Sequence, residues 1–178
     1  MSVNISARQL LEADLVDEVR AVLRQTKLDP ATLILEITEG ALLQGIEETS
    51  QKLTGLKALG VKVAIDDFGT GSSSLGYLRE FKVDMLKIDR SFVHGMTESP
   101  EDGQVLVQAI LDLARALHLD VVAEGIELPE QLASLRASGC GSGQGFHFAK
   151  PVAAEALAAM LEQTVSPALV ARQATRVS

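Results

Sequence analysis

Two adjacent carboxylates, Asp66 and Asp67, follow directly on the apolar run that begins at Val61, and a segment rich in Gly and Ser comes after them. Side chains of this type can form a local turn or cap a following helix. Carboxylate oxygens are also the ligands that hard divalent cations prefer. The pair therefore indicates either a turn or a metal site, and its surroundings must decide between the two.

Polar groups also stand at or just beyond the ends of other apolar runs. They are Asn4, Glu36, Glu39, Lys87, Asp89, Glu124, Glu127 and Gln144. Each one alone has an ordinary structural explanation, such as a helix cap, a turn or a surface lysine with a buried stem. Several carboxylates brought to one place would repel one another and raise one another's pKa. Bound cations are the simplest compensation for such a cluster.

The types of these side chains indicate which cation they would bind. Carboxylate and amide oxygens favour Mg²⁺ or Mn²⁺. Two such ions about 3.5–4 Å apart are a recurring arrangement for the hydrolysis of phosphodiesters, and one of two adjacent aspartates can bridge them. Lys87 could then orient the attacking water or neutralise phosphate oxygens. The remaining candidate ligands lack metal-binding spacing and are interpreted as structural: Cys140, His94, His118 and His147.

Short apolar runs alternate with amphipathic stretches along the chain. The runs predict strands at 32–38, 61–66, 83–89, 120–125 and 143–148, and the stretches predict helices at 7–25, 46–59, 102–118, 129–138 and 153–163. This alternation is typical of an α/β fold with a parallel sheet. An open doubly wound sheet and a (β/α) barrel both fit the pattern. In either architecture the functional groups lie at the carboxyl ends of the strands.

Length and composition set the limits of the interpretation. The chain has 178 residues, 47% of them hydrophobic, which suits one globular domain. A net charge of −8 without a basic stripe argues against binding to duplex nucleic acid. No apolar run approaches the roughly 20 residues that span a bilayer, and the start of the chain lacks the pattern of a signal peptide. The single cysteine fits a reducing compartment, so we predict a cytoplasmic protein.

Six segments resemble, in order and spacing, the EAL-domain family of cyclic di-GMP phosphodiesterases. They are VNIS (3–6), LEITE (35–39), AIDDFGTGSSSLGYL (64–78), KIDRSFV (87–93), VVAEGIE (121–127) and GQGFHFAKP (143–151). The resemblance runs from about residue 2 to residue 152. It implies a TIM-type (β/α) barrel and the hydrolysis of cyclic di-GMP to linear pGpG in bacterial second-messenger signalling, with Mg²⁺ or Mn²⁺ as cofactor.

Carried over position by position, the resemblance implies a role for each matching residue. The metal ligands would be Asn4, Glu36, Asp66 and Asp67, with Asp66 shared between two ions. Lys87 would contact the attacking water, Glu124 would assist catalysis beside the metals, and Gln144 would position water or substrate. The segment after Asp67 would couple metal binding to dimerisation through Glu39, Phe68, Gly69, Thr70, Gly71 and Ser72.

In relatives, the Glu-Ala-Leu motif that names the family lies well before the position that matches Asn4, and this sequence has no such motif before Asn4. The resemblance implies that one metal ligand and a substrate-binding Arg are missing with it. A complete (β/α)₈ domain has about 250 residues. The resemblance therefore implies a barrel truncated at its N-terminus to about six of eight strands, with a partial domain at 1–164 and a frayed tail at 165–178. Open strand edges would require a homodimer, a partner chain that supplies the missing strands, or a missing upstream segment.

Three functions remain open from the sequence. The first is a cyclic di-GMP phosphodiesterase, nearly inactive as an isolated chain because one metal ligand is missing. The second is a degenerate EAL module that binds cyclic di-GMP or a protein partner without turnover. The third is a metal-dependent phosphohydrolase with another substrate, which the density of motifs disfavours.

Overall fold

The computed structural model describes residues 1–71, 75–154, 156–157 and 160. The chain forms two compact units, Met1–Phe148 and Ala149–Ser178, and each is described by itself. In the second unit the described residues 154, 156, 157 and 160 are helical, within the predicted helix 153–163. The predicted tail 165–178 and its boundary lie outside the described residues.

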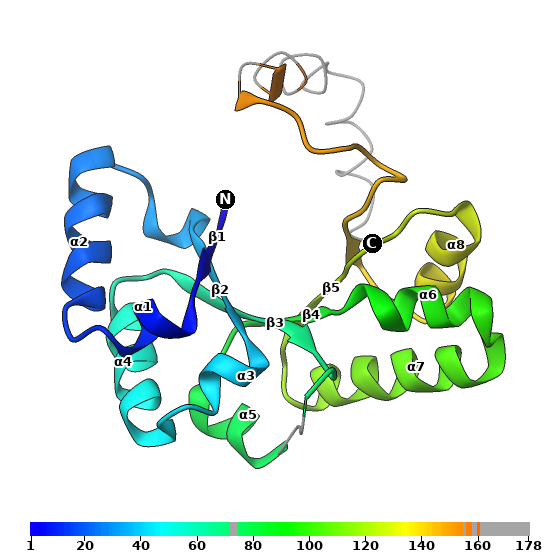
Figure 1. Cartoon of the computed structure of the whole chain (residues 1–178), viewed down its shortest axis with the longest axis horizontal. Coiled ribbons are helices and arrows are strands. Elements are labelled where there is room, and N and C mark those ends of the chain that lie inside the picture. The colour runs from blue at the N-terminus through cyan, green and yellow to red at the C-terminus, as the bar shows by residue number, and fades with distance from the viewer. Residues whose placement is uncertain (72–74, 155, 158–159, 161–178) are drawn as a thin grey trace, which may run out of the picture. The chain divides into compact units, whose positions relative to one another are not determined.

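The first unit is built on a six-stranded parallel sheet in which the strands follow one another in chain order (Figure 1). The strands are β1 Ser2–Ile5, β2 Ile34–Thr38, β3 Lys62–Phe68, β4 Met85–Ile88, β5 Asp120–Ala123 and β6 Ser142–Gly143. Within the described residues β1 and β6 stand at the two ends of this order, so the sheet is not closed. The predicted α/β fold with a parallel sheet is confirmed.

Helices connect the strands. They are α1 Ala7–Leu11, α2 Leu15–Thr26, α3 Glu39–Leu42, α4 Ile46–Ala58, α5 Leu75–Phe81, α6 Arg90–Glu98, α7 Pro100–Ala116 and α8 Pro129–Ala137, with a 3₁₀ turn η1 at Pro30–Thr32. The helix predicted at 7–25 is interrupted. Ser6 and Gln9 cap α1 reciprocally, and Glu12 then adopts an extended conformation that ends the helix after five residues. A new helix starts after Asp14.

The structure also differs from the sequence-based elements at other places. The sequence did not predict α3, α5 or α6, each of which follows a site-bearing segment. The strand predicted at 143–148 is shorter, because β6 ends at Gly143 and the chain then turns back on the residue Ile126. These differences lie where short segments are shaped by tertiary contacts rather than by periodicity.

The strand register separates an outer from an inner face of the sheet. The outer face carries aliphatic side chains that are 0–2% exposed: Leu35, Ile37, Val63, Ile65, Leu86 and Ile88. Helices cover this face, including α4 over β3 and α7 over β4 and β5 (Figure 1). Burying each such side chain contributes about 1.5–3 kcal/mol. The alternate positions, which point to the inner face, include Glu36 and Lys87.

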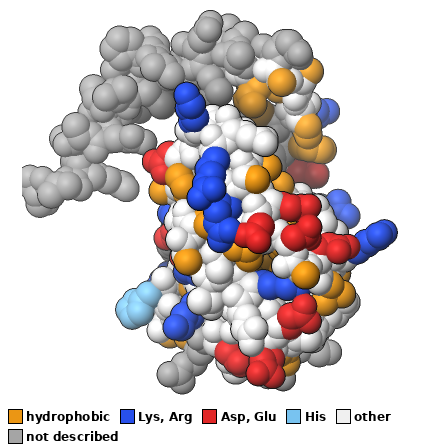
Figure 2. All heavy atoms as spheres, turned by 90° about the vertical axis from the view of Figure 1, so that its left-hand side faces the viewer, with side chains coloured by type: hydrophobic (Ala, Val, Ile, Leu, Met, Phe, Trp, Pro, Cys, Tyr) orange, Lys and Arg blue, Asp and Glu red, His pale blue; other side chains and the backbone are white. Residues whose placement is uncertain are grey.

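Figure 2 shows the side of the molecule on which α2 and α4 lie. Acidic and basic side chains are interspersed there, with apolar side chains between them. A groove of about 360 Å³ between β1, α2 and β2 is lined mainly by apolar residues, including the exposed Val3 and Val22. In the described part of the chain, no helix has both the length and the apolar character needed to cross a membrane.

Candidate active site at the carboxyl ends of the strands

A β-bulge at the end of β3 places Asp66 and Asp67 on the same side of the sheet. Ile65 pairs with Leu86 and Phe68 pairs with Ile88. Between these two pairs, β3 therefore has one residue more than β4. Asp67 is the extra residue of the bulge and adopts the left-handed conformation, with φ of 52°. Asp tolerates this conformation better than most residues do. The Thr70 amide and hydroxyl both donate to the Asp67 carbonyl and secure this turn. The sequence did not predict the bulge.

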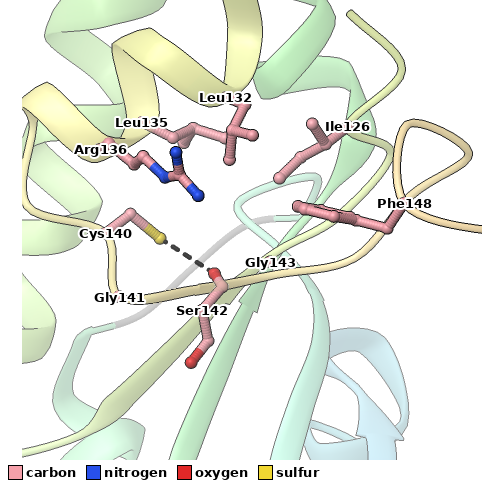
Figure 3. Close-up of a pocket in the computed structure, with 9 residues that line it drawn as sticks. All are labelled: Ile126, Leu132, Leu135, Arg136, Cys140, Gly141, Ser142, Gly143 and Phe148. Carbon is pink, nitrogen blue, oxygen red and sulfur yellow. Dashed lines mark hydrogen bonds between the residues drawn. The ribbon is translucent and has the colours of Figure 1, made fainter. Parts of the chain in front are cut away.

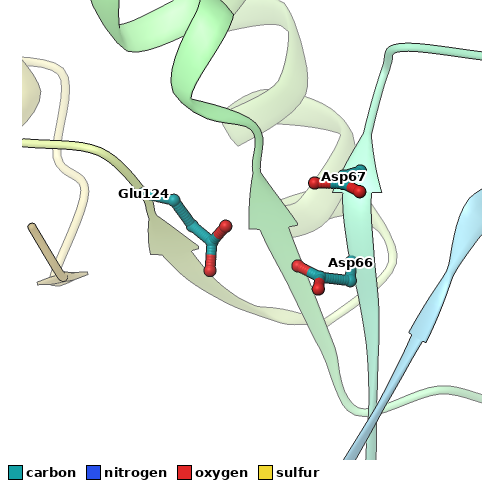
Figure 4. Close-up of side chains that lie close together, drawn as sticks. All are labelled: Asp66, Asp67 and Glu124. Carbon is teal, nitrogen blue, oxygen red and sulfur yellow. The ribbon is translucent and has the colours of Figure 1, made fainter. Parts of the chain in front are cut away.

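Three carboxylates from two strand ends converge on one point. One ligand oxygen from each of Asp66, Asp67 and Glu124 lies within 4.8 Å of the others. Figure 4 shows the Glu124 carboxylate, just beyond β5, facing the two aspartates across the end of β4. All of these donors are oxygens, and such a set fits a hard divalent cation. The cluster could therefore hold a metal ion.

Lys87 lies at the centre of the site and is only 4% exposed. Its Nζ is 2.7 Å from a Glu36 oxygen, 2.8 Å from an Asp66 oxygen and 2.6 Å from a Glu124 oxygen. Burial alone would lower the pKa of Lys87, but hydrogen bonds to the three carboxylates raise it above its ordinary value. Lys87 is thus a buried, charged group that ties together β2, β3 and β4 and the residue after β5.

The site carries more negative charge than Lys87 can balance. Burial raises the pKa of Glu124; Lys87 opposes this shift, while Asp66 and Glu36 add to it. Burial also raises the pKa of Asp67, and the neighbouring charges of Asp66 and Asp89 raise it further. Both shifts have the direction that a bound cation would reverse.

Gln144 and Asp89 border this cluster. The Gln144 amide Nε2, one residue beyond β6, donates to a Glu124 oxygen at 2.6 Å. Asp89 caps α6 and accepts hydrogen bonds from the Ser91 backbone and hydroxyl. Burial would raise the pKa of Asp89, but the Ser91 hydrogen bonds outweigh it, so the pKa is lowered. Asp89 therefore stands ionised beside Asp67.

Asn4 is placed at the margin of the site. It lies on β1 in register with Glu36 of β2, so its side chain points to the same face of the sheet. The side chain is exposed. The fold therefore brings Asn4 to the site's side of the sheet, next to the strand of Glu36, and its ligand role stays a prediction.

The segment after Asp67 is anchored from below by Glu39. This glutamate is 8% exposed, and its Oε2 accepts a hydrogen bond from the Gly69 amide at 3.0 Å. A Cβ at Gly71 would lie 3.1 Å from the other Glu39 oxygen, so the loop passes close over this carboxylate. Phe68 is the buried last residue of β3 rather than part of the loop, which corrects its assignment. Ser72 lies outside the described residues, and the coupling of this loop to dimerisation stays a prediction.

A pocket of about 590 Å³ opens beside the carboxylates. It is lined by Asp67, Thr70, Asp89, Arg90, Glu124, Gly125, Glu127, Gln144, Gly145 and Phe146. Arg90 and Phe146 line this pocket although the sequence did not predict either of them there. Arg90 had a usable signal, since it directly follows a strand end, whereas Phe146 enters through the turn after β6.

A second pocket, of about 360 Å³, lies between α8 and β6 (Figure 3). Its lining combines the apolar Ile126, Leu135 and Phe148 with the polar Arg136 and Ser142. Cys140 lies at its edge and donates a weak hydrogen bond from Sγ to the Ser142 carbonyl. Burial raises the pKa of this thiol. None of the three converging carboxylates lines this pocket.

Fold and site together define an α/β protein of the barrel type, with a carboxylate-rich site at the carboxyl ends of its strands. The chain matches the family model of the EAL domain over residues 1–151. It therefore belongs to the EAL domain family, as the sequence motifs predicted.

Two curated relatives come from Pseudomonas aeruginosa. The cyclic di-GMP phosphodiesterase NbdA is 48% identical over 88% of this chain and 20% of its own length. The bifunctional diguanylate cyclase/cyclic di-GMP phosphodiesterase MucR is 43% identical over 89% of this chain and 23% of its own length. The chain thus spans about a fifth of the length of these relatives.

Solved structures show the same fold. The PaMucR phosphodiesterase in complex with c-di-GMP superposes with a TM-score of 0.84 at 44% identity, covering 88% of this chain and 63% of that one. The EAL domain of Mycobacterium smegmatis DcpA gives a TM-score of 0.86 at 40% identity, covering 91% of this chain and 72% of that one. Both likenesses cover most of this chain.

Proposed function

We propose that this chain takes part in the hydrolysis of cyclic di-GMP to linear pGpG, in bacterial second-messenger signalling. The observation that carries the proposal is the convergence of Asp66, Asp67 and Glu124 within 4.8 Å of one another. The phosphodiesterase names of NbdA and MucR support the reaction class, and the c-di-GMP complex of PaMucR supports the substrate.

The donor set fits two Mg²⁺ or Mn²⁺ ions, with Asn4, Glu36, Asp66 and Asp67 as the proposed ligands. Such ions, when bound, supply an activated water and stabilise charge on the attacked phosphate. Asp66 is the proposed shared ligand, because it contacts the same Lys87 ammonium as Glu36, and the bulge at the end of β3 leaves it on one side with Asp67.

The other residues of the site have roles that follow from their contacts. Lys87 stays protonated among three carboxylates, so its ammonium can hold the attacking water or a phosphate oxygen by a charge-assisted hydrogen bond. Glu124, whose pKa burial raises, is suited to accept or return a proton beside that water. Gln144 keeps the Glu124 carboxylate in place through its amide.

The 590 Å³ pocket is the proposed binding place of the substrate. Its opening adjoins Asp67 and Glu124, and the Arg90 guanidinium lines it and can pair with a phosphate. A cyclic dinucleotide bound there would present a phosphodiester to the metal site.

The test is turnover by the purified chain. Cyclic di-GMP is incubated with the chain and Mn²⁺, and pGpG is followed by chromatography. Asp66→Ala should abolish turnover, whereas Asp120→Ala, which removes an exposed carboxylate at the opposite end of β5, should leave it unchanged. Binding of cyclic di-GMP without turnover would favour the non-catalytic EAL module. If the chain neither binds nor hydrolyses cyclic di-GMP in the presence of Mn²⁺, the proposal is contradicted.

Assembly and location complete the proposal. An open sheet order from β1 to β6 supports a homodimer, a partner chain or an upstream segment of the same protein at its edges. A cytoplasmic location is part of the same proposal, since the proposed substrate is an intracellular messenger.

A further inference from the structure

The chain after β5 and the chain after β6 are joined backbone to backbone. The backbone N–H of Gln144 donates to the Ala123 carbonyl at 2.8 Å, and the backbone N–H of Ile126 donates to the backbone carbonyl of Gln144 at 3.1 Å. The Ile126 carbonyl accepts from the His147 amide at 2.9 Å. Ile126 therefore uses both of its backbone polar groups to hold the turn that carries Gln144.

Glycines allow this close approach. A Cβ at Gly145 would overlap the backbone nitrogen, carbon and oxygen of Ile126. A Cβ at Gly143 would lie 2.5 Å from Ile126 Cδ1. The Ile126 side chain is 1% exposed and fills the space beneath the turn, where it lines the pocket of Figure 3. Any side chain at Gly145 must push the turn away from Ile126.

The position of this turn matters because Gln144 reaches the site from it. Its Nε2 lies 2.6 Å from a Glu124 oxygen, and Glu124 stands two residues before Ile126. A shift of the turn by a few tenths of an ångström would lengthen or misalign this hydrogen bond. The orientation of the Glu124 carboxylate toward Asp66 and Asp67 depends in part on that contact.

We infer that Ile126 and Gly145 form a positioning pair. The pair holds the side-chain amide of Gln144 within hydrogen-bonding distance of Glu124 and so orients the carboxylate cluster. The inference rests on the proposed function only in the expectation that this cluster holds metal. Glu124 is one of the three carboxylates that could hold an ion together. Loss of a hydrogen-bonding partner behind such a group typically weakens metal affinity about 10- to 100-fold. Neither residue touches the reacting atoms, and both act through Gln144.

The central variant is Gly145→Ala, and Gly141→Ala is its matched control. A Cβ at Gly141 meets nothing within 4 Å, although this glycine precedes β6 in the same segment. Gly103→Ala is a second control, because its Cβ would collide with the Gly95 backbone between α6 and α7 and damage packing elsewhere. Ile126→Ala, which removes the side chain beneath the turn, replaces Gly145→Ala if that protein does not fold.

The first measurement needs no metal. The side-chain amide resonances of Gln144, assigned with Gln144→Glu, should be shifted downfield in the unsubstituted chain by the hydrogen bond to Glu124. They should move toward free-amide values in Gly145→Ala or Ile126→Ala, and stay in place in Gly141→Ala and Gly103→Ala. Unchanged Gln144 resonances in a folded Gly145→Ala or Ile126→Ala protein would overturn the inference.

The second measurement is Mn²⁺ affinity, followed by the electron paramagnetic resonance signal of free Mn²⁺. Gly145→Ala should bind Mn²⁺ about tenfold or more weakly than the unsubstituted chain, and Gly141→Ala should bind it equally well. If the unsubstituted chain binds no Mn²⁺, the proposed function fails, and the positioning inference is then decided by the amide resonances alone. Equal Mn²⁺ affinity in Gly145→Ala would overturn the link from Gln144 to the metal site.

Discussion

Leu86 and Lys87 are neighbours on β4, yet they serve opposite faces of one sheet. Leu86 is fully buried among aliphatic side chains of the outer face. Lys87 is 4% exposed on the inner face, where it contacts Glu36, Asp66 and Glu124. Both positions are inaccessible to water, but one is stabilised by apolar burial and the other by ion pairs that must offset a large desolvation cost.

The comparison of the two faces shows that the inner face stabilises the folded protein less than the outer face does. The outer face is aliphatic throughout β2, β3 and β4, with Leu, Ile or Val at its positions. The inner face gathers carboxylates whose burial raises the pKa values of Asp67 and Glu124. A protein selected for stability alone would not keep these acids together. Such a gathering of acids fits the metal ion that this cluster could hold.

Removing the charge at the centre of the inner face should have the largest effect. Lys87→Met leaves three carboxylates without their shared cation, so the metal-free protein should lose about 4 kcal/mol of unfolding free energy and all turnover. Urea unfolding with and without Mn²⁺ measures this. Mn²⁺ should restore part of the loss by supplying positive charge.

Lys57→Met is the matched control for that substitution. Lys57 pairs with Asp84 at 2.7 Å, but it is half-buried and lies far from the site, at the other end of β4. Its removal should cost about 1 kcal/mol, independently of Mn²⁺. A Lys87→Met protein no less stable than Lys57→Met would contradict the electrostatic account of the inner face.

A substitution on the outer face should destabilise without touching the chemistry. Leu86→Ala removes a fully buried side chain and should cost about 3 kcal/mol of unfolding free energy. The folded fraction should keep the Mn²⁺ affinity of the unsubstituted chain, because the inner face is unchanged. Affinity measured at low temperature, where the variant is folded, checks this. A large loss of affinity would show that the two faces are not independent.

Neutralising one acid of the inner face should separate stability from function. Asp67→Asn removes a carboxyl group whose pKa is raised by burial and by the charges of Asp66 and Asp89. Asn accepts the positive φ of this position. The metal-free protein should gain about 0.5 kcal/mol, while Mn²⁺ affinity should fall about tenfold or more. A loss of stability in the metal-free variant would mean that Asp67 is a structural anchor rather than a strained acid.

The smallest effect is expected at Cys140, away from both faces. Burial raises the pKa of its thiol, so the folded state keeps this proton when the unfolded state loses it. Stability should therefore fall as pH rises above the ordinary thiol pKa of about 8.5. Cys140→Ala should show a shallower decline over that range in urea unfolding. Identical slopes would mean that Cys140 is as accessible in the folded state as in the unfolded chain.

Much of this architecture was predictable from the sequence. The alternation of apolar runs with amphipathic stretches predicted parallel strands, and their polar ends predicted where Glu36, Asp66, Lys87 and Glu124 would meet. Helix α5 was missed because it has only seven residues, too few for a clear periodicity. Helix α6 has nine residues, like the predicted α8, but lacks the proline in the first turn that marks the start of α8. The break between α1 and α2 was missed because it depends on local backbone geometry at Glu12.

The sequence by itself determined the order of strands and helices and the kinds of side chain at each strand end, because periodicity and residue type are local properties. Tertiary structure decided how those side chains meet. The bulge that aligns Asp66 with Asp67 exists only through the pairing of β3 with β4. The three contacts of Lys87 and the link from Gln144 to Glu124 join residues 20 to 51 positions apart. Such contacts depend on strand register and on the close packing of Gly145 against Ile126, which no local pattern encodes.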